Sequence, residues 1–202
     1  MIETFLRPPR GPAELAADGV RLLGVLSIVV AFLGWSALDV AVFALGLLGL
    51  VIPRFLGIRP SLDAAFGVTV LVAAWSALLD LYQAVPHWDI LVHFTLNGLI
   101  AVVIYVLAMR CGVIPDPERS QVRLGSIVIL TTAFGLAAGV IWEVVEWVGH
   151  TYIDQTIFVG YTDTIGDLAA GGLGSLLAGF AGRYLSARSR YVAEARPERA
   201  PL

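Results

Sequence analysis

Long apolar stretches alternate with short polar connections along this chain of 202 residues. A helix needs about 20 predominantly apolar residues to cross a bilayer, because each residue advances it by about 1.5 Å. Six stretches approach or exceed that length, namely residues 19–35, 38–54, 62–84, 88–110, 124–149 and 163–185. The pattern therefore predicts an all-α fold, a polytopic membrane helix bundle with six transmembrane helices.

The composition agrees with a membrane protein, with 58% hydrophobic and 14% charged residues. A soluble domain is about half apolar and about a quarter charged. The chain has no lysine, and with six spans each of its 13 arginines falls in, or at the end of a span that adjoins, the N-terminal tail, the second or fourth connection, or the C-terminal tail. Because basic residues concentrate on the cytoplasmic side of membranes, this segregation predicts that both the N and C termini are cytoplasmic.

The spans divide the chain into three parts. Residues 1–17 form a cytoplasmic or membrane-surface tail, residues 18–186 the six-helix transmembrane domain, and residues 187–202 an arginine-rich cytoplasmic tail. Ser36 and Asp39 have the spacing of a capping box at the start of the second span, so we interpret Asp39 as a cap. The predicted partner is the lipid bilayer. The sequence has no patch typical of nucleic-acid binding, and it leaves the oligomeric state open.

The outer half of the bundle, which has no arginine, contains many acids and all three histidines. These residues are Asp80, Asp89, Glu143, Glu146, Asp154, Asp163, Asp167, His87, His93 and His150. Buried carboxylates must be paired, bound to metal or protonated, because an isolated charge in apolar surroundings is costly. Salt bridges to arginine are not available on that side, so another form of neutralisation is required.

The spacing of these residues places several of them on common helix faces. Asp89 and His93 are four residues apart, with Asn97 continuing their face, and Asp163 and Asp167 are again four apart. Glu143, Glu146 and His150 also follow one stripe of a helix. We expect the three stripes to converge at the extracytoplasmic ends of the last three spans.

A shared divalent metal is the interpretation that best accounts for this convergence. The predicted ligands are His93, Glu143, Glu146 and Asp167, with Asp89 and Asp163 as further ligands or as groups that support them. A mixed set of carboxylate and imidazole donors favours zinc, manganese or iron over magnesium or calcium. Shared protons and a wet structural pocket are the alternatives, and Asp89 and Asp163 taken singly also suit helix caps.

The connection at residues 151–162, TYIDQTIFVGYT, is too apolar for a freely solvated loop. We expect it to fold over the cluster as a partial lid that limits water access. Ile157 and Phe158 are the expected lid side chains, and Asn97 and His150 are further candidates for contact with a substrate. The alternative is an interfacial anchor resting in the lipid headgroups, which the aromatic content also favours.

Three motifs resemble a known family pattern: DILVHF at 89–94, WEVVEW at 142–147 and DTIGDLAAGGLG at 163–174. They are similar to the signature of the YjdF-like family of largely uncharacterised bacterial inner-membrane proteins, and more distantly to that of the VanZ-like family. In the VanZ-like pattern the second glutamate is often glutamine and the second aspartate often asparagine, whereas this chain has Glu146 and Asp167. The resemblance, which covers residues 80–185, implies a multi-pass protein of the bacterial plasma membrane in a cell-envelope context.

Three functions are compatible with such a cluster, and the sequence leaves catalysis open. The first is a metal-dependent hydrolase or transferase acting on a lipid or lipid-linked envelope precursor. The second is a cation- or proton-coupled transporter, and the third is a non-catalytic envelope factor with a structural metal. Below the cluster, Asn97 and Thr131–Thr132 are the main polar interruptions of the inner helix halves. A one-sided pocket opening to the extracytoplasmic side is therefore favoured over a transport path.

Overall fold

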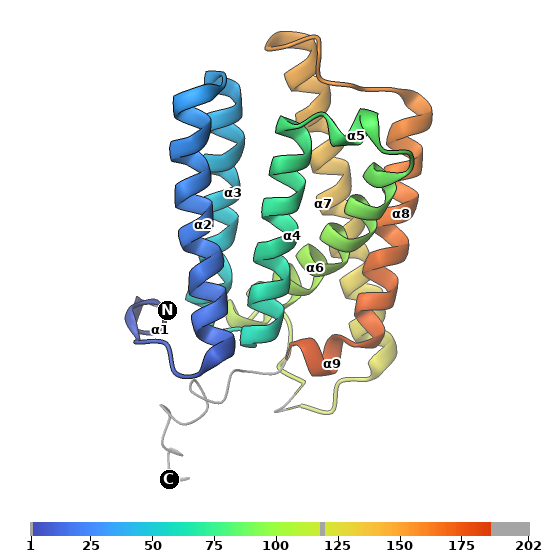
Figure 1. Cartoon of the computed structure of the whole chain (residues 1–202). Coiled ribbons are helices and arrows are strands. Elements are labelled where there is room, and N and C mark those ends of the chain that lie inside the picture. The colour runs from blue at the N-terminus through green and yellow to red at the C-terminus, as the bar shows by residue number, and fades with distance from the viewer. Residues whose placement is uncertain (1, 118–119, 187–202) are drawn as a thin grey trace. The chain divides into compact units, whose positions relative to one another are not determined.

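The computed structural model describes residues 2–117 and 120–186, and these residues contain helices and no strand. The predicted arginine-rich tail at 187–202 lies outside the described residues. The helices are α1 (Ile2–Leu6), α2 (Pro12–Gly34), α3 (Ala37–Leu56), α4 (Pro60–Leu78), α5 (Leu81–Ala84), α6 (Trp88–Arg110), α7 (Leu124–Tyr152), α8 (Tyr161–Phe180) and α9 (Gly182–Leu185). They are shown in Figure 1. The described chain forms two compact units: the first holds residues 2–75 together with 185–186, and the second holds Ser76–Tyr184.

In the first unit, α2 and α3 form a helical hairpin and pack side by side (Figure 1). The Ser36 hydroxyl accepts a hydrogen bond from the backbone amide of Asp39 at 3.3 Å, and the Asp39 carboxylate accepts one from the amide of Ser36 at 3.0 Å. This reciprocal arrangement satisfies free amides at the start of α3. The predicted capping box is therefore confirmed.

The helix α2 begins at Pro12, earlier than the expected start of the first span at residue 19. Proline suits the first turn of a helix, since the amide that it lacks would have no partner there. The added turns carry Glu14, which is 3% exposed, and Asp18. Both acids form ion pairs with arginines, which neutralise their charge in the fold. In the sequence alone, these charged residues resembled a polar tail and not the start of a helix.

Ion pairs made by Arg7, Arg21 and Arg54 connect the N-terminal segment with the helices α2, α3 and α4. Glu14 pairs with Arg7 at 2.8 Å and lies 4.0 Å from Arg54. Arg21 pairs with Asp18 at 2.9 Å and with Asp63 at 2.6 Å. The aromatic ring of Phe5 on α1 stacks on Phe55 of α3, with centroids 4.3 Å apart. Residues expected to form a tail thus include a short helix held against the unit.

The third predicted span, 62–84, is not one continuous helix. α4 ends at Leu78, and the short α5 follows after Asp80, whose φ of 53° lies in the left-handed region. A non-glycine residue pays a steric cost there, and a helix does not continue through such a residue. The apolar pattern alone did not reveal this break.

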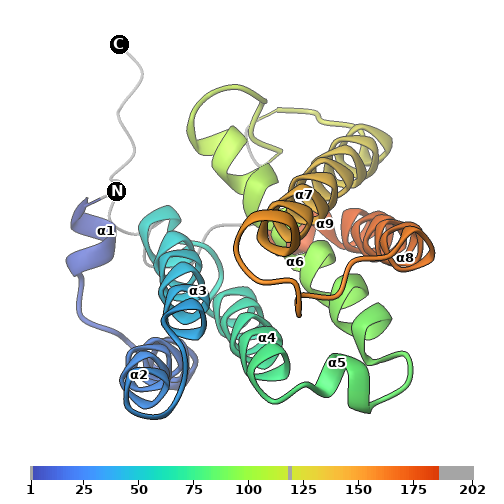
Figure 2. The ribbon, with the colours of Figure 1, turned by 90° about the horizontal axis from the view of Figure 1, so that it is seen from above.

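In the second unit, α6, α7 and α8 pack against one another, as seen from above in Figure 2. Small residues line these contacts. A Cβ on Gly98 of α6 would lie 2.9 Å from the carbonyl oxygen of Gly174 on α8, and one on Gly179 would lie 2.9 Å from the Cα of Val128 on α7. The glycines therefore allow close backbone approach, as is common between membrane helices.

Five helices in the described ranges are long and apolar enough to cross a membrane: α2, α3, α4, α6 and α7. The sixth predicted span corresponds to α8, which is not among these five. Its 20 residues include Asp163, Asp167 and several glycines, which lower its apolar content. The fold is thus all-helical and multi-pass, while the count of six spans and the orientation of the termini stay predictions.

Candidate metal centre

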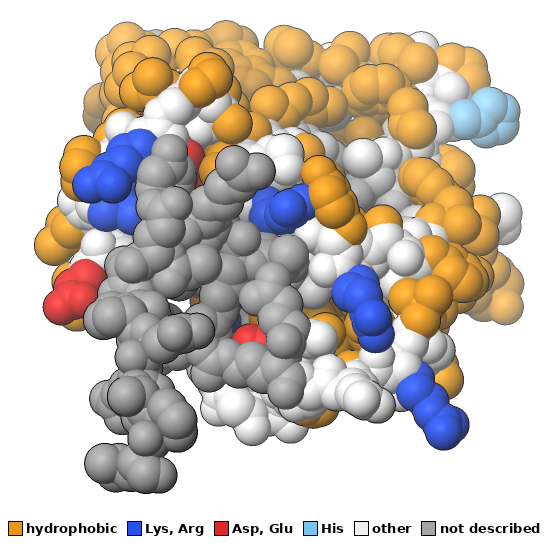
Figure 3. Space-filling view, turned by 90° about the horizontal axis from the view of Figure 1, so that it is seen from below, with side chains coloured by type: hydrophobic (Ala, Val, Ile, Leu, Met, Phe, Trp, Pro, Cys, Tyr) orange, Lys and Arg blue, Asp and Glu red, His pale blue; other side chains and the backbone are white. Residues whose placement is uncertain are grey.

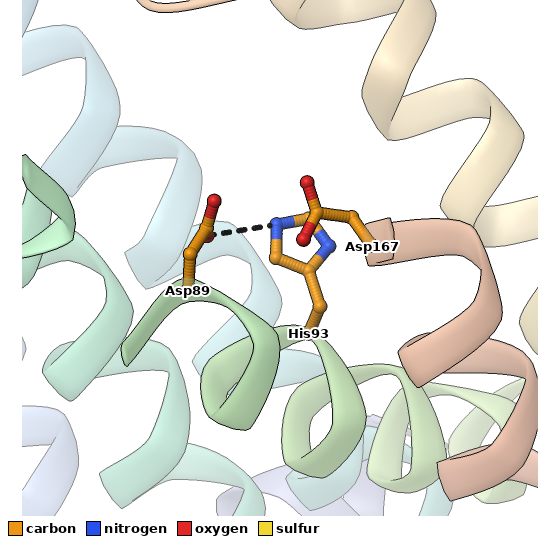
Figure 4. Close-up of side chains that lie close together, drawn as sticks. All are labelled: Asp89, His93 and Asp167. Atoms are coloured by element: carbon orange, nitrogen blue, oxygen red, sulfur yellow. Dashed lines mark ion pairs between the residues drawn. The ribbon is translucent and has the colours of Figure 1, made fainter. Parts of the chain in front are cut away.

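Asp89 and His93 meet on one face of α6, near the start of that helix. Oδ1 of Asp89 lies 3.3 Å from Nε2 of His93, one helical turn away (Figure 4). The predicted four-residue spacing thus places the carboxylate and the imidazole side by side. Both residues are partly exposed.

Asp167 of α8 approaches the same imidazole from the neighbouring helix (Figure 4). Asp89, His93 and Asp167 each offer one ligand atom, and the three atoms lie within 4.8 Å of one another. Asp167 is 2% exposed, and its Oδ1 atom has no hydrogen-bond partner among the described residues. A buried polar atom without a partner is costly, so this carboxylate is suited to receive a cation or a proton.

Close packing of α8 on α6 sets the position of Asp167. Two turns further along α8, Gly174 lies against the carbonyl group of Phe94, where a Cβ would have no room. The neighbouring Ser175 hydroxyl donates to the carbonyl oxygen of Asn97 at 3.2 Å or of Gly171 at 2.7 Å. These contacts align the Asp163–Asp167 face of α8 with the Asp89–His93 face of α6.

The other predicted ligands lie near this group without belonging to its close donor set. Glu143 of α7 is 9% exposed, and its Oε1 atom also has no hydrogen-bond partner among the described residues. Its charge acts on Asp163, Asp167 and Glu146. Glu146 accepts a hydrogen bond from the side chain of Trp142, and the charges of His93 and Asp89 act on it. The charged groups that act on Glu146, Asp163 and Asp167 are His93 and other carboxylates.

The capping alternative for Asp89 and Asp163 receives partial support. Both lie in the first turn of their helices, where a negative charge meets a favourable helix dipole. The N-cap positions themselves are His87 and Gly160, and neither helix start has a side-chain cap hydrogen bond. The side chain of Asp89 instead faces His93, which the capping interpretation does not explain.

Asn97 lies deeper along α6 than the donor group. It is 6% exposed and fills the space beside two glycines, Gly139 of α7 and Gly171 of α8. A Cβ at Gly139 would lie 3.1 Å from Nδ2 of Asn97, and one at Gly171 would clash with the same amide. The asparagine thus packs where the three helices meet, and its contact with a substrate stays a prediction.

The connection after α7 folds back on the end of its own helix. Nδ1 of His150 lies 2.6 Å from the carbonyl oxygen of Ile157, and the Ile157 side chain packs on Gly149. Phe158 is 56% exposed. Within the loop, Oδ1 of Asp154 accepts hydrogen bonds from the amide and hydroxyl of Thr156 at 2.9 and 2.7 Å, which hold the pKa of this carboxyl below its ordinary value. Coverage of the cluster by this loop stays a prediction.

Tyr82 is a residue near the cluster that the sequence did not single out. It lies on the short α5, and burial raises the pKa of its phenol, as do the charges of Asp89, Glu146 and Asp167. The phenol therefore keeps its proton and can act as a hydrogen-bond donor. Its position follows from the turn at Asp80, which the apolar pattern did not reveal.

The arginines described in the second unit lie at the opposite end from the cluster. α6 ends at Arg110, α7 begins after Arg123, and Arg183 follows α8 and donates to the carbonyl oxygen of Val122. Arginine side chains are visible on the face seen from below in Figure 3. The segregation of charge expected from the sequence is therefore present along the helices of this unit.

Comparison with known proteins yields one family. No curated protein and no solved structure matches the chain. Residues 20–188 match the family described as "Predicted membrane protein (DUF2238)". This match supports the expectation of a membrane protein family, without specifying the YjdF-like or VanZ-like relation. Because the matched region covers most of the sequence, the chain belongs to this family of membrane proteins.

Proposed function

We propose that this membrane protein binds a divalent transition metal through Asp89, His93 and Asp167. The observation that carries the proposal is the approach of three donor atoms from two helices to within 4.8 Å of one another. The unpartnered Oδ1 of the buried Asp167 supports it, because a cation would satisfy that oxygen.

The chemistry of the donors suits zinc, manganese or iron. Zinc lies about 2.0–2.2 Å from imidazole nitrogen and carboxylate oxygen, so neighbouring donors in a zinc site are roughly 3.0–3.5 Å apart. The 3.3 Å separation of Asp89 and His93 falls in this range. Glu146, which interacts with both α6 residues, is the proposed fourth ligand.

The proposed setting is the plasma membrane of a bacterium, with both termini cytoplasmic and the cluster on the extracytoplasmic side. In this topology α8 is the sixth span, since its 20 residues reach about 30 Å. A bound divalent metal activates water and stabilises developing negative charge. The proposed reaction class is hydrolysis or group transfer on a lipid or lipid-linked envelope precursor, whose headgroup would lie at the depth of the cluster.

A transport path is less compatible with the packing below the cluster. Asn97 fills the space beside Gly139 and Gly171, and Gly98 lies against the backbone of Gly174. A path for a hydrated ion needs polar groups and room for water along its length. The close contacts between α6 and α8 leave no such room at this level.

Metal analysis of the purified full chain tests the proposal. The wild-type protein should hold about one zinc, manganese or iron ion per chain at low free metal. His93→Ala and Asp167→Asn should each reduce the bound metal to a small fraction, because each removes a ligand. Asp154→Asn is the matched control, since this acid lies at the same end of the unit and bonds locally to Thr156. Equal metal content in all four proteins would contradict the proposal.

A further inference from the structure

The start of α6 lacks the side-chain cap that usually holds the first turn of a helix. Its N-cap residue, His87, has a φ of 61° and makes no side-chain cap hydrogen bond. An N-cap residue usually has an extended backbone, and its side chain accepts a hydrogen bond from an amide of the first turn. Asp89 lies in this turn, but its carboxylate is 3.3 Å from the imidazole of His93. Something other than a cap must therefore hold the turn that carries this proposed metal ligand.

The connection that leads into α6 is strained at both of its ends. Asp80, before α5, and His87, before α6, have φ values of 53° and 61°. They are the two non-glycine residues with a positive φ in the part of the chain that the structure describes. Residues other than glycine reach this left-handed region at a steric cost, so such a backbone persists only where surrounding contacts enforce it. We therefore looked for a contact that keeps the two ends of residues 80–87 in place.

A hydrogen bond to a buried serine joins the two ends of this connection. Nε1 of Trp88, the first residue of α6, donates to Oγ of Ser76 on α4 at 2.9 Å. Ser76 is 0% exposed, so its hydroxyl is shielded from water that would compete for the indole. An indole has a single N–H donor, and Trp88 uses it here. The bond therefore ties the residue directly before Asp89 to the last turns of α4.

We propose that Trp88 and Ser76 are positioning residues for the metal centre, and that their hydrogen bond holds Asp89 within reach of His93. This inference rests on the proposed function and extends it to two residues that do not bind the ion themselves. Without the bond, the backbone before α6 is free to leave its strained conformation, and the first turn rotates or frays. The carboxylate of Asp89 then moves away from the imidazole, whereas His93 stays one turn inside the helix. Because Asp89 is one of three donors, the affinity for metal falls.

A second tryptophan–serine bond in the chain provides a matched control. Nε1 of Trp75 donates to Oγ of Ser27 at 3.0 Å, and Ser27 is 5% exposed. The bond has the same donor and acceptor groups, and its serine is also buried. Both residues belong to the first unit, whereas the donor group belongs to the second. Ser27→Ala thus reports the effect of losing such a bond outside the unit that holds the metal centre.

Titration of the metal-free full chain in detergent with Co²⁺ tests the proposal. The absorption spectrum of bound Co²⁺ depends on the number and geometry of its ligands, so it responds when a ligand is displaced. Trp88→Phe keeps an aromatic ring and removes the donor, and Ser76→Ala removes the acceptor. Each should weaken Co²⁺ binding about tenfold, the lower end of the range for groups that orient metal ligands, and each should alter the spectrum.

The double variant and the control complete the test. Trp88→Phe combined with Ser76→Ala should bind Co²⁺ no more weakly than either single variant, because all three proteins lack the same bond. Ser27→Ala should match wild type in both affinity and spectrum. Additive weakening in the double variant would show that the two residues act independently, which contradicts the proposal.

The outcomes separate this inference from the proposed function. Wild-type affinity and spectrum in both Trp88→Phe and Ser76→Ala overturn the positioning role and leave the metal site intact. Equal weakening by Ser27→Ala also overturns it, since the effect would then not be specific to the start of α6. No binding of Co²⁺ by wild type contradicts the proposed metal centre and, with it, this inference. If Ser76→Ala does not elute as a monodisperse protein, Trp88→Phe decides, since Trp88 is partly exposed and the variant keeps an aromatic ring.

Discussion

Gly174 of α8 lies directly against the carbonyl group of Phe94 of α6, so closely that a Cβ has no place between the two helices. The contact fixes how far α8 is displaced along α6. Asp167 lies two turns before Gly174, and His93 directly precedes Phe94. The glycine contact therefore sets the register in which the carboxylate of α8 reaches the imidazole of α6.

Gly174→Ala is expected to destabilise the protein and to weaken metal binding. The added methyl group must push α8 away from the backbone of α6, and overpacking of this kind costs about 1–3 kcal/mol. The displacement also moves Asp167 away from His93. The free energy of unfolding in a denaturant titration, together with bound metal per chain, measures both effects.

Gly19→Ala is the matched control for this substitution. Gly19 lies within α2, and no atom comes within 4 Å of a Cβ built there. Alanine should leave the free energy of unfolding unchanged or raise it by up to about 1 kcal/mol, because alanine favours helix. If both variants behave alike, the glycine contact does not determine the position of α8.

Glu14→Gln is expected to lower the free energy of unfolding by about 1.5–3 kcal/mol, the usual worth of a hydrogen bond to a charged group. Glu14 is 3% exposed and pairs with Arg7 at 2.8 Å, so the neutral amide weakens that contact, whereas Arg54 keeps Asp18 at 3.4 Å. Glu3→Gln, at an exposed position, is the control. Equal stability of both variants would show that the network contributes little.

The native cysteine allows a direct test of orientation. Cys111 is exposed, directly after α6, and is the only cysteine of the chain. If both termini are cytoplasmic, a membrane-impermeant maleimide should leave Cys111 unlabelled in intact cells and label it after permeabilisation. A cysteine at Gln155, in a Cys111→Ser background, should be labelled in intact cells. Labelling of both sites from the same side would contradict the predicted topology.

The loop of residues 151–162 is expected to respond to metal if it is a lid. Hydrogen exchange at the amides around Ile157 should slow when metal is added, and His150→Ala should remove this effect by breaking the contact with the Ile157 carbonyl. The control is His87→Ala, another histidine near this end of the unit. An exchange rate that does not change with metal would favour the interfacial anchor.

The sequence predicted much of the fold because apolar length and charge placement are local properties. The expected span at 88–110 coincides with α6, and the expected cap at Ser36 is present. The prediction of a continuous span at 62–84 failed at Asp80, because this residue in the left-handed region ends the helix within an apolar stretch. The sequence pattern also placed the first helix too late, because the charges of Glu14 and Asp18 resembled a tail until their arginine partners were known.

The candidate site was predictable to the level of helix faces. The spacing of Asp89 and His93 placed them together, and the face of Asp163 and Asp167 followed from the same rule. Which acids approach which depends on the register between helices, set by contacts such as Gly174 with Phe94. That register has no signal in the spacing. Tyr82 was not foreseen for a different reason, since the left-handed turn at Asp80 determines its position.

Anomalous diffraction from crystals of the full chain grown with zinc tests the central claim most directly. Data collected at the zinc absorption edge should show a peak between Asp89, His93 and Asp167, about 2.0–2.2 Å from the ligand atoms. A peak at that place, lost in crystals of His93→Ala, is the predicted result. Zinc bound elsewhere, with Asp89 and His93 joined only by their mutual hydrogen bond, would contradict the proposed metal centre.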